Sequence, residues 1–104
     1  MGKPLIIGLN PAWQRINLVN ELNEGEVHRC TEVHALASGK GINSAYVLKQ
    51  LGQKSVVLQF LGGSHGKSIQ SDLKSWGIES LNLKTKSNTR ICTSLIDKKS
   101  GLTT

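Results

Sequence analysis

Glycine, cationic and amide side chains gather in the segment Ser38–Asn43, at the start of a predicted helix. A helix N-terminus presents unpaired N–H groups and the positive end of the helix dipole. Glycines let a ligand approach the backbone, Lys40 adds a cation, and Asn43 offers a donor and an acceptor. The segment, which includes Gly39, predicts a pocket for an anionic or polyhydroxyl ligand. An ordinary glycine-rich helix entry fits these residues equally well.

A second polar segment, Asn10–Arg15, follows the apolar run Pro4–Leu9. Ligands of open α/β sheets bind beyond the carboxyl ends of the strands. We therefore expect Asn10, Gln14 and Asn43 to converge as hydrogen-bond partners for hydroxyl groups. A simple strand-ending turn is the alternative interpretation.

Two arginines are candidates for binding a phosphate. Arg90 opens a late β segment, and Arg29 lies in a predicted hairpin. The guanidinium group binds phosphate through two parallel hydrogen bonds, which lysine does less well. Taken alone, each arginine is equally consistent with a solvated surface.

The segment Gly62–Ser68 resembles a nucleotide-binding P-loop, GxxxxGK[ST], but its spacing is one residue too short. Position 61, where the first glycine would stand, is Leu61. A P-loop needs a fixed ring of backbone amides, so we reject a nucleotide site here. We expect a turn in which Ser64 caps the following helix. The histidines are scattered, and no metal-ligand spacing is present.

The elements that would position these residues alternate between strands and helices. Pro4–Leu9 is a continuous apolar run, which predicts a strand buried on both faces. Ile69, Leu73 and Trp76 recur at helical spacing, and glycines 52 and 77 follow the two predicted helices. Alternating strands and helices predict a mostly parallel α/β sheet. The antiparallel hairpin of residues 13–20 and 27–36 interrupts this order, so we expect it to stand off the sheet.

Composition narrows the class of protein. The chain has 104 residues, 38% hydrophobic and 19% charged, which is typical of one globular domain. The formal charge of +6 comes from dispersed cations, and aromatic content is 4%, so a nucleic-acid-binding surface is disfavoured. No apolar run approaches the ~18 residues of a membrane span. Cys30 and Cys92 have no paired spacing, and with no signal-peptide pattern we expect free thiols in a cytoplasmic protein.

Taken in order, several segments resemble the N-terminal part of the PfkB family of carbohydrate kinases, which are ribokinase-like. The similarity is to the branch containing 1-phosphofructokinase and tagatose-6-phosphate kinase. The segments that carry this resemblance are Leu9–Ala12, Gly25–Arg29, Gly39–Asn43, Phe60–Gly63 with Gly66, and Thr89–Arg90.

The resemblance implies a three-layer α/β fold with a β lid made from residues 13–20, 27–36 and 90–104. It implies phosphoryl transfer from ATP, with Mg, to a phosphosugar, and a homodimer contact through the lid. Gly39, Lys40 and Asn43 would then contact the sugar. Arg90 would bind its phosphate, with Arg29 as the second candidate.

The sequence also departs from the family pattern. Gln14 stands where the family usually has an aspartate that binds sugar hydroxyls, and Ser38 stands where it prefers glycine. The chain has no GAGD-like segment, which in this family supplies the catalytic base beside the ATP site. We therefore expect residues 1–104 to form the N-terminal part of a larger kinase domain, inactive alone. A non-catalytic phosphosugar-binding module, or a decayed remnant of such a kinase, is the alternative.

Overall fold

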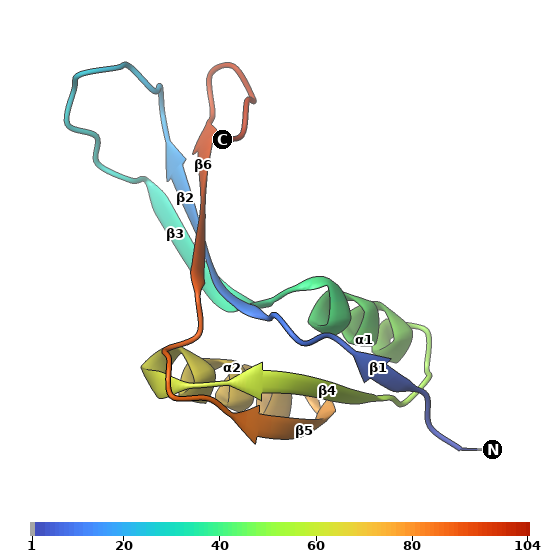
Figure 1. The fold of residues 1–104 in the computed structure, drawn as a ribbon. Coiled ribbons are helices and arrows are strands. Elements are labelled where there is room, and N and C mark those ends of the chain that lie inside the picture. The colour runs from blue at the N-terminus through green and yellow to red at the C-terminus, as the bar shows by residue number, and fades with distance from the viewer. Residues whose placement is uncertain (1) are drawn as a thin grey trace.

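The computed structural model describes residues 2–104, which form an α/β body and a second sheet that projects from it (Figure 1). The body contains three parallel strands in the order β1-β4-β5: β1 (Leu5–Ile7), β4 (Val56–Leu61) and β5 (Glu79–Lys84). Helix α1 (Lys40–Gln50) precedes β4, and α2 (Gly63–Trp76) connects β4 to β5. The predicted parallel α/β arrangement is confirmed.

Both helices pack on the same face of the β1-β4-β5 sheet. Successive right-handed crossovers in one direction along a sheet bring the connecting helices to one side. Ile69 and Leu73 of α2 are 0% and 1% exposed, as their helical spacing predicts. The core cluster that joins the helices to the sheet comprises Ala37, Ile42, Ala45, Val57, Leu61, Ile69, Leu73 and Ile78.

The opposite face of this sheet is exposed and apolar. Leu5 and Ile7 of β1 are 54% and 65% exposed, so the expectation of a strand buried on both faces was wrong. Within the described residues the helices cover one face only, and side chains of alternate residues point away from them. We call this surface the open face; it contains Leu5, Ile7, Leu9, Phe60, Leu81 and Leu83.

The second sheet has the order β3-β2-β6 and extends away from the helices (Figure 1). Strand β2 (Ala12–Val19) pairs antiparallel with β3 (Glu32–Ser38) and parallel with β6 (Ile91–Asp97). The predicted hairpin is present, but β3 begins at Glu32 rather than at residue 27. Residues 20–31 form the connection between β2 and β3. Val27 within it is 98% exposed and pairs with no strand, so β3 does not extend back to it.

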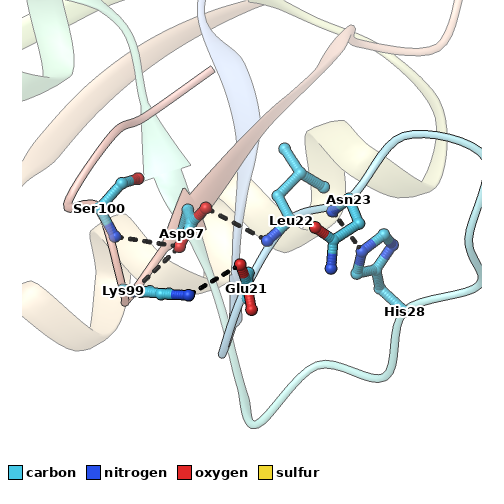
Figure 2. A network of polar contacts seen from close by, with 7 residues as sticks. All are labelled: Glu21, Leu22, Asn23, His28, Asp97, Lys99 and Ser100. Atoms are coloured by element: carbon cyan, nitrogen blue, oxygen red, sulfur yellow. Dashed lines mark hydrogen bonds and ion pairs between the residues drawn. The ribbon is translucent and has the colours of Figure 1, made fainter.

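Strand β6 is also shorter than the expected segment 90–104. It ends at Asp97, because a turn at residues 98–101 reverses the chain and Thr103 forms a bridge back to Ile96. The Asp97 carboxylate accepts hydrogen bonds from the backbone N–H groups of Leu22, Lys99 and Ser100 (Figure 2). These bonds lower the pKa of Asp97, and the bond from Leu22 has the largest effect. The carboxylate thus joins the end of β6 to the start of the 20–31 connection.

The predicted carboxyl ends of the helices are confirmed, whereas the predicted cap of α2 is not. Gly52 and Gly77 adopt positive φ after α1 and α2, as predicted. Ser64, in contrast, does not cap α2; the expectation was wrong, because the helix already begins at Gly63 and Ser64 lies inside it. The cap comes instead from a distant segment, where Asn88 Oδ1 accepts the His65 N–H at 3.1 Å.

In residues 2–104, neither helix has the length and apolar character needed to cross a membrane.

Candidate functional site

A cleft of about 360 Å³ lies where the body meets the second sheet. Three segments that are distant in the sequence line it: residues 7–11 at the carboxyl end of β1, residues 39–42 at the start of α1, and Arg90 before β6. The carboxyl end of β1 and the amino end of α1 therefore meet, as the expectation for an open α/β sheet required.

Three glycines are required by the close packing around this cleft. Gly39, the residue before α1, has φ 125° and ψ 159°, a backbone conformation that L side chains rarely adopt. A Cβ at Gly39 would also lie 3.0 Å from the Pro11 Cα. Gly41 packs against Gly8, and a Cβ on either residue would approach the backbone of the other within 2.8 Å. These glycines bring the end of β1 against the first turn of α1.

The cleft has a positive character. Lys40 and Arg90 are among its lining residues, and the lining contains no carboxylate. In the described residues no side chain caps the amino end of α1, and its first turn has no acidic residue. The free N–H groups of this turn and the helix dipole add to the attraction for an anion.

Hydrogen bonds hold the Arg90 guanidinium beside the cleft. Its Nη2 donates to the Asn10 carbonyl oxygen at 3.1 Å, and its Nη1 lies 3.0 Å from the Cys92 Sγ. Cys92 and Cys30 are both free thiols. The arginine thus bridges the end of β1 and the start of β6 with part of its donor capacity still available.

The remaining predicted residues lie outside this cleft. Asn43 lines a neighbouring apolar pocket of about 320 Å³ formed with Leu36, Tyr46 and Trp76. The structure thus brings together Gly39, Lys40 and Arg90 of the predicted site residues, with Asn43 one pocket away.

Gln14 and Arg29 are placed differently. Gln14 lies on β2, and its Nε2 donates to the Ser94 Oγ at 2.9 Å. Arg29 is exposed on the 20–31 connection. The predicted convergence of Asn10, Gln14 and Asn43 is not observed. Each has a different partner: Asn43 Oδ1 accepts from Ser38 Oγ, Gln14 donates to Ser94, and the Asn10 carbonyl oxygen accepts from Arg90.

Sequence reasoning missed the loop of residues 85–90 as a structural partner of α2. Gly62 and Gly63 admit this loop: a Cβ at Gly62 would overlap the Ser87 carbonyl oxygen, and one at Gly63 would overlap the Asn88 side chain. The double glycine of the P-loop-like segment therefore makes room for backbone and side-chain atoms of this loop. No local pattern signals this contact, because the two segments are far apart in the sequence.

The amino end of α2, which carries the P-loop-like segment, forms hydrogen bonds to the loop of residues 85–90. The Gly62 N–H donates to Thr89 Oγ1 and the His65 N–H to Asn88 Oδ1, so part of the amino end of α2 is already satisfied. Among residues 2–104, no group of three His, Cys, Asp or Glu side chains is arranged to hold a metal.

A family model described as pfkB family carbohydrate kinase matches residues 7–104. The chain belongs to this family of carbohydrate kinases, as the ordered segments of its sequence predicted.

Curated relatives carry sugar-phosphate kinase names. The chain is 39% identical over 83 residues to a 1-phosphofructokinase of Borreliella burgdorferi, a match that covers 80% of this chain and 27% of that protein. It is 29% identical over 92 residues to a tagatose-6-phosphate kinase of Staphylococcus epidermidis, covering 88% of this chain and 30% of that protein. The chain thus spans less than a third of the length of these relatives and corresponds to their N-terminal part.

The fold matches about a third of a solved kinase structure. Phosphofructokinase-2 from Escherichia coli, crystallised with fructose-6-phosphate, superposes with a TM-score of 0.93 at 22% identity. The match covers 100% of this chain and 34% of that one. The expected ribokinase-like α/β class is therefore confirmed.

Proposed function

We propose that the chain binds a phosphosugar and is the substrate-side part of a phosphofructokinase-like sugar kinase. The observation that carries this proposal is the cleft in which Arg90, Lys40 and the uncapped amino end of α1 meet without a carboxylate. A phosphate is the anion that best matches such a set of donors, since it accepts several charge-assisted hydrogen bonds at once. The names of the relatives, 1-phosphofructokinase and tagatose-6-phosphate kinase, support the same class of ligand.

Each predicted site residue has a role in this proposal. Arg90 binds the phosphate of the sugar, and Gly39 and Lys40 line the adjoining part of the pocket. Asn43, in the neighbouring pocket, and Gln14, on β2, are the candidates for contacts to the sugar hydroxyls. Lys40 is exposed and is the first residue of α1, where its charge adds to the positive end of the helix dipole.

The second sheet acts as the lid in this proposal. It meets the body beside the cleft, so its movement would close over a bound sugar and exclude water from phosphoryl transfer. Arg29 lies on the connection between β2 and β3, far from the cleft lining. It is the second candidate for a phosphate contact, and it would reach a phosphate only in a closed or paired arrangement. A homodimer through the lid is part of the same proposal.

The phosphoryl donor in this proposal is ATP with Mg, held by parts of the kinase domain that correspond to the longer relatives. Residues 1–104 would then form the N-terminal portion of that domain. The catalytic base and the phosphate-neutralising groups that phosphoryl transfer needs would come from the rest of the domain.

Calorimetry on the 104-residue chain tests the binding step. Fructose 1-phosphate, fructose 6-phosphate and tagatose 6-phosphate are titrated separately, with unphosphorylated fructose as the reference sugar. We expect saturable binding of at least one phosphosugar. Arg90→Ala should weaken it by about 10- to 100-fold, the range for losing a charge-assisted hydrogen bond.

Arg15→Ala is the matched control, because Arg15 is an exposed arginine on β2 outside the cleft. It should leave the affinity unchanged. Absence of binding by all three phosphosugars would overturn the proposed binding function. Binding without turnover when the complete gene product is assayed with MgATP would favour a non-catalytic binding module.

A further inference from the structure

The loop of residues 85–90 is fastened to the amino end of α2 through Thr89. The Thr89 N–H donates to the Gly62 carbonyl oxygen at 2.9 Å, and its Oγ1 accepts the Gly62 N–H at 3.0 Å. The same hydroxyl lies 3.3 Å from the Gly62 carbonyl oxygen, to which it donates. Thr89 thus contacts both backbone groups of one residue, which fixes its position against α2.

A third connection joins this residue to the helix. The Thr89 carbonyl oxygen lies 2.7 Å from His65 Nδ1, which donates in this contact. The His65 N–H in turn donates to Asn88 Oδ1 at 3.1 Å. We call Gly62, His65, Asn88 and Thr89 the α2 latch.

The latch holds the residue that precedes Arg90, and the sheet holds Arg90 itself. The Arg90 carbonyl oxygen accepts the Trp13 N–H at 2.9 Å, which joins it to β2. The backbone of Arg90 is therefore fixed from both sides, by α2 before it and by β2 after it. An arginine side chain has several rotatable bonds, and a fixed backbone removes part of the entropy lost when it binds an anion.

We propose that Thr89 is a positioning residue for Arg90, acting through the α2 latch. This inference rests on the proposed phosphosugar site, because it assumes that Arg90 binds the phosphate. The hydroxyl group is the feature that matters. Serine preserves both hydroxyl hydrogen bonds to Gly62, whereas valine has the shape of threonine but keeps only the bond from its backbone N–H.

A double-mutant cycle on the 104-residue chain tests the proposal, with the affinity for fructose 6-phosphate measured by NMR titration. Thr89→Val should weaken binding by about tenfold, and Thr89→Ser should restore most of the loss. In the Arg90→Ala background, Thr89→Val should have no further effect, because its role passes through Arg90. An undiminished effect in that background would show a general structural role and overturn the proposal.

Thr85→Val is the matched control from the same loop. The Thr85 hydroxyl donates to the Ser87 carbonyl oxygen at 3.0 Å, inside the loop, and makes no hydrogen bond to α2. Its replacement should leave the affinity unchanged.

His65→Ala removes an independent bond of the latch and should weaken binding in the same Arg90-dependent way. This second variant keeps the test decisive if Thr89→Val lowers the folded fraction.

A second readout separates this inference from the proposed function. Backbone ¹⁵N relaxation at Arg90 is measured without ligand; Thr89→Val should lower its order parameter from about 0.85 towards about 0.6, and Thr89→Ser should not. If no phosphosugar binds but this change is seen, the latch positions Arg90 and the proposed ligand is wrong. If Arg90 stays equally ordered in Thr89→Val, the latch proposal is wrong whatever the ligand.

Discussion

At the scale of single residues, position 39 requires glycine for two structural reasons, its backbone conformation and the lack of space for a Cβ. Its φ of 125° is costly for any residue with a Cβ, and that Cβ would also press on the Pro11 Cα. From sequence, Gly39 is interpreted as allowing a ligand close to the backbone. The structure adds a reason that holds with no ligand present, namely the tight junction between β1 and α1.

Gly39→Ala should therefore lower the free energy of unfolding by about 2–3 kcal/mol, measured by urea denaturation without ligand. Gly52→Ala is the matched control, because Gly52 also has a positive φ, +84°, but a Cβ added there would meet no atom within 4 Å. It should cost only the backbone strain, about 1 kcal/mol. Equal losses in the two variants would show that contact with Pro11 contributes nothing.

At the scale of elements, the Asp97 carboxylate adds side-chain hydrogen bonds to the tip of the second sheet. Asp97 ends β6 and binds backbone N–H groups on both sides of the tip, while Lys99 pairs with Glu21 at 3.1 Å (Figure 2). The Lys99–Glu21 pair is largely exposed, and such pairs contribute little to stability. The bonds to Asp97 therefore contribute more than this ion pair, and they act together with the backbone bonds from Lys98 N–H to the Val19 carbonyl oxygen at 3.0 Å and from Lys99 N–H to the Asn20 carbonyl oxygen at 3.1 Å.

The hydrogen bonds to the Asp97 carboxylate should be lost in acid. The pKa of Asp97 is lowered below its ordinary value of 3.8, so its stabilising effect is complete above that value and disappears as the pH falls through the lower, folded-state pKa. In an NMR titration from pH 6 to pH 2, the amide signals of Leu22 and Ser100 should move with a midpoint below 3.8. Asp97→Asn should remove this transition. A midpoint above 3.8 would contradict the assignment.

At the scale of the whole molecule, the chain is more extended than its length requires. Its radius of gyration is 15.8 Å, against about 13 Å for a compact domain of this size. The projecting second sheet accounts for part of the difference, and the open face leaves one side of the body without a covering layer. Contiguous apolar surface of this kind favours self-association.

Replacing Leu81 and Leu83 together with threonine should reduce the concentration-dependent association of the chain, followed by sedimentation velocity. Threonine suits an exposed strand, so the free energy of unfolding should change little. Val57→Thr is the buried counterpart: Val57 is 0% exposed on the covered face, and an unpartnered hydroxyl there should cost about 1–3 kcal/mol. Association that is identical in the double variant and the unmodified chain would show that the open face does not drive it.

The sequence by itself determined the elements and the family. Helical spacing identified Ile69 and Leu73 as core residues, glycines marked the ends of both helices, and ordered motifs identified the kinase family. These properties are readable because they depend on residues that are neighbours in the sequence, through the periods of helix and strand.

Only the tertiary structure decided which distant residues meet. It covers one face of β1 and leaves Leu5 and Ile7 exposed, and it caps α2 with Asn88 in place of Ser64. It also brings Arg90 to the cleft beside Lys40. Such contacts follow from the order of strands and the close packing of loops on helix ends. No local pattern encodes them, because the energy of each contact depends on a segment far away in the chain.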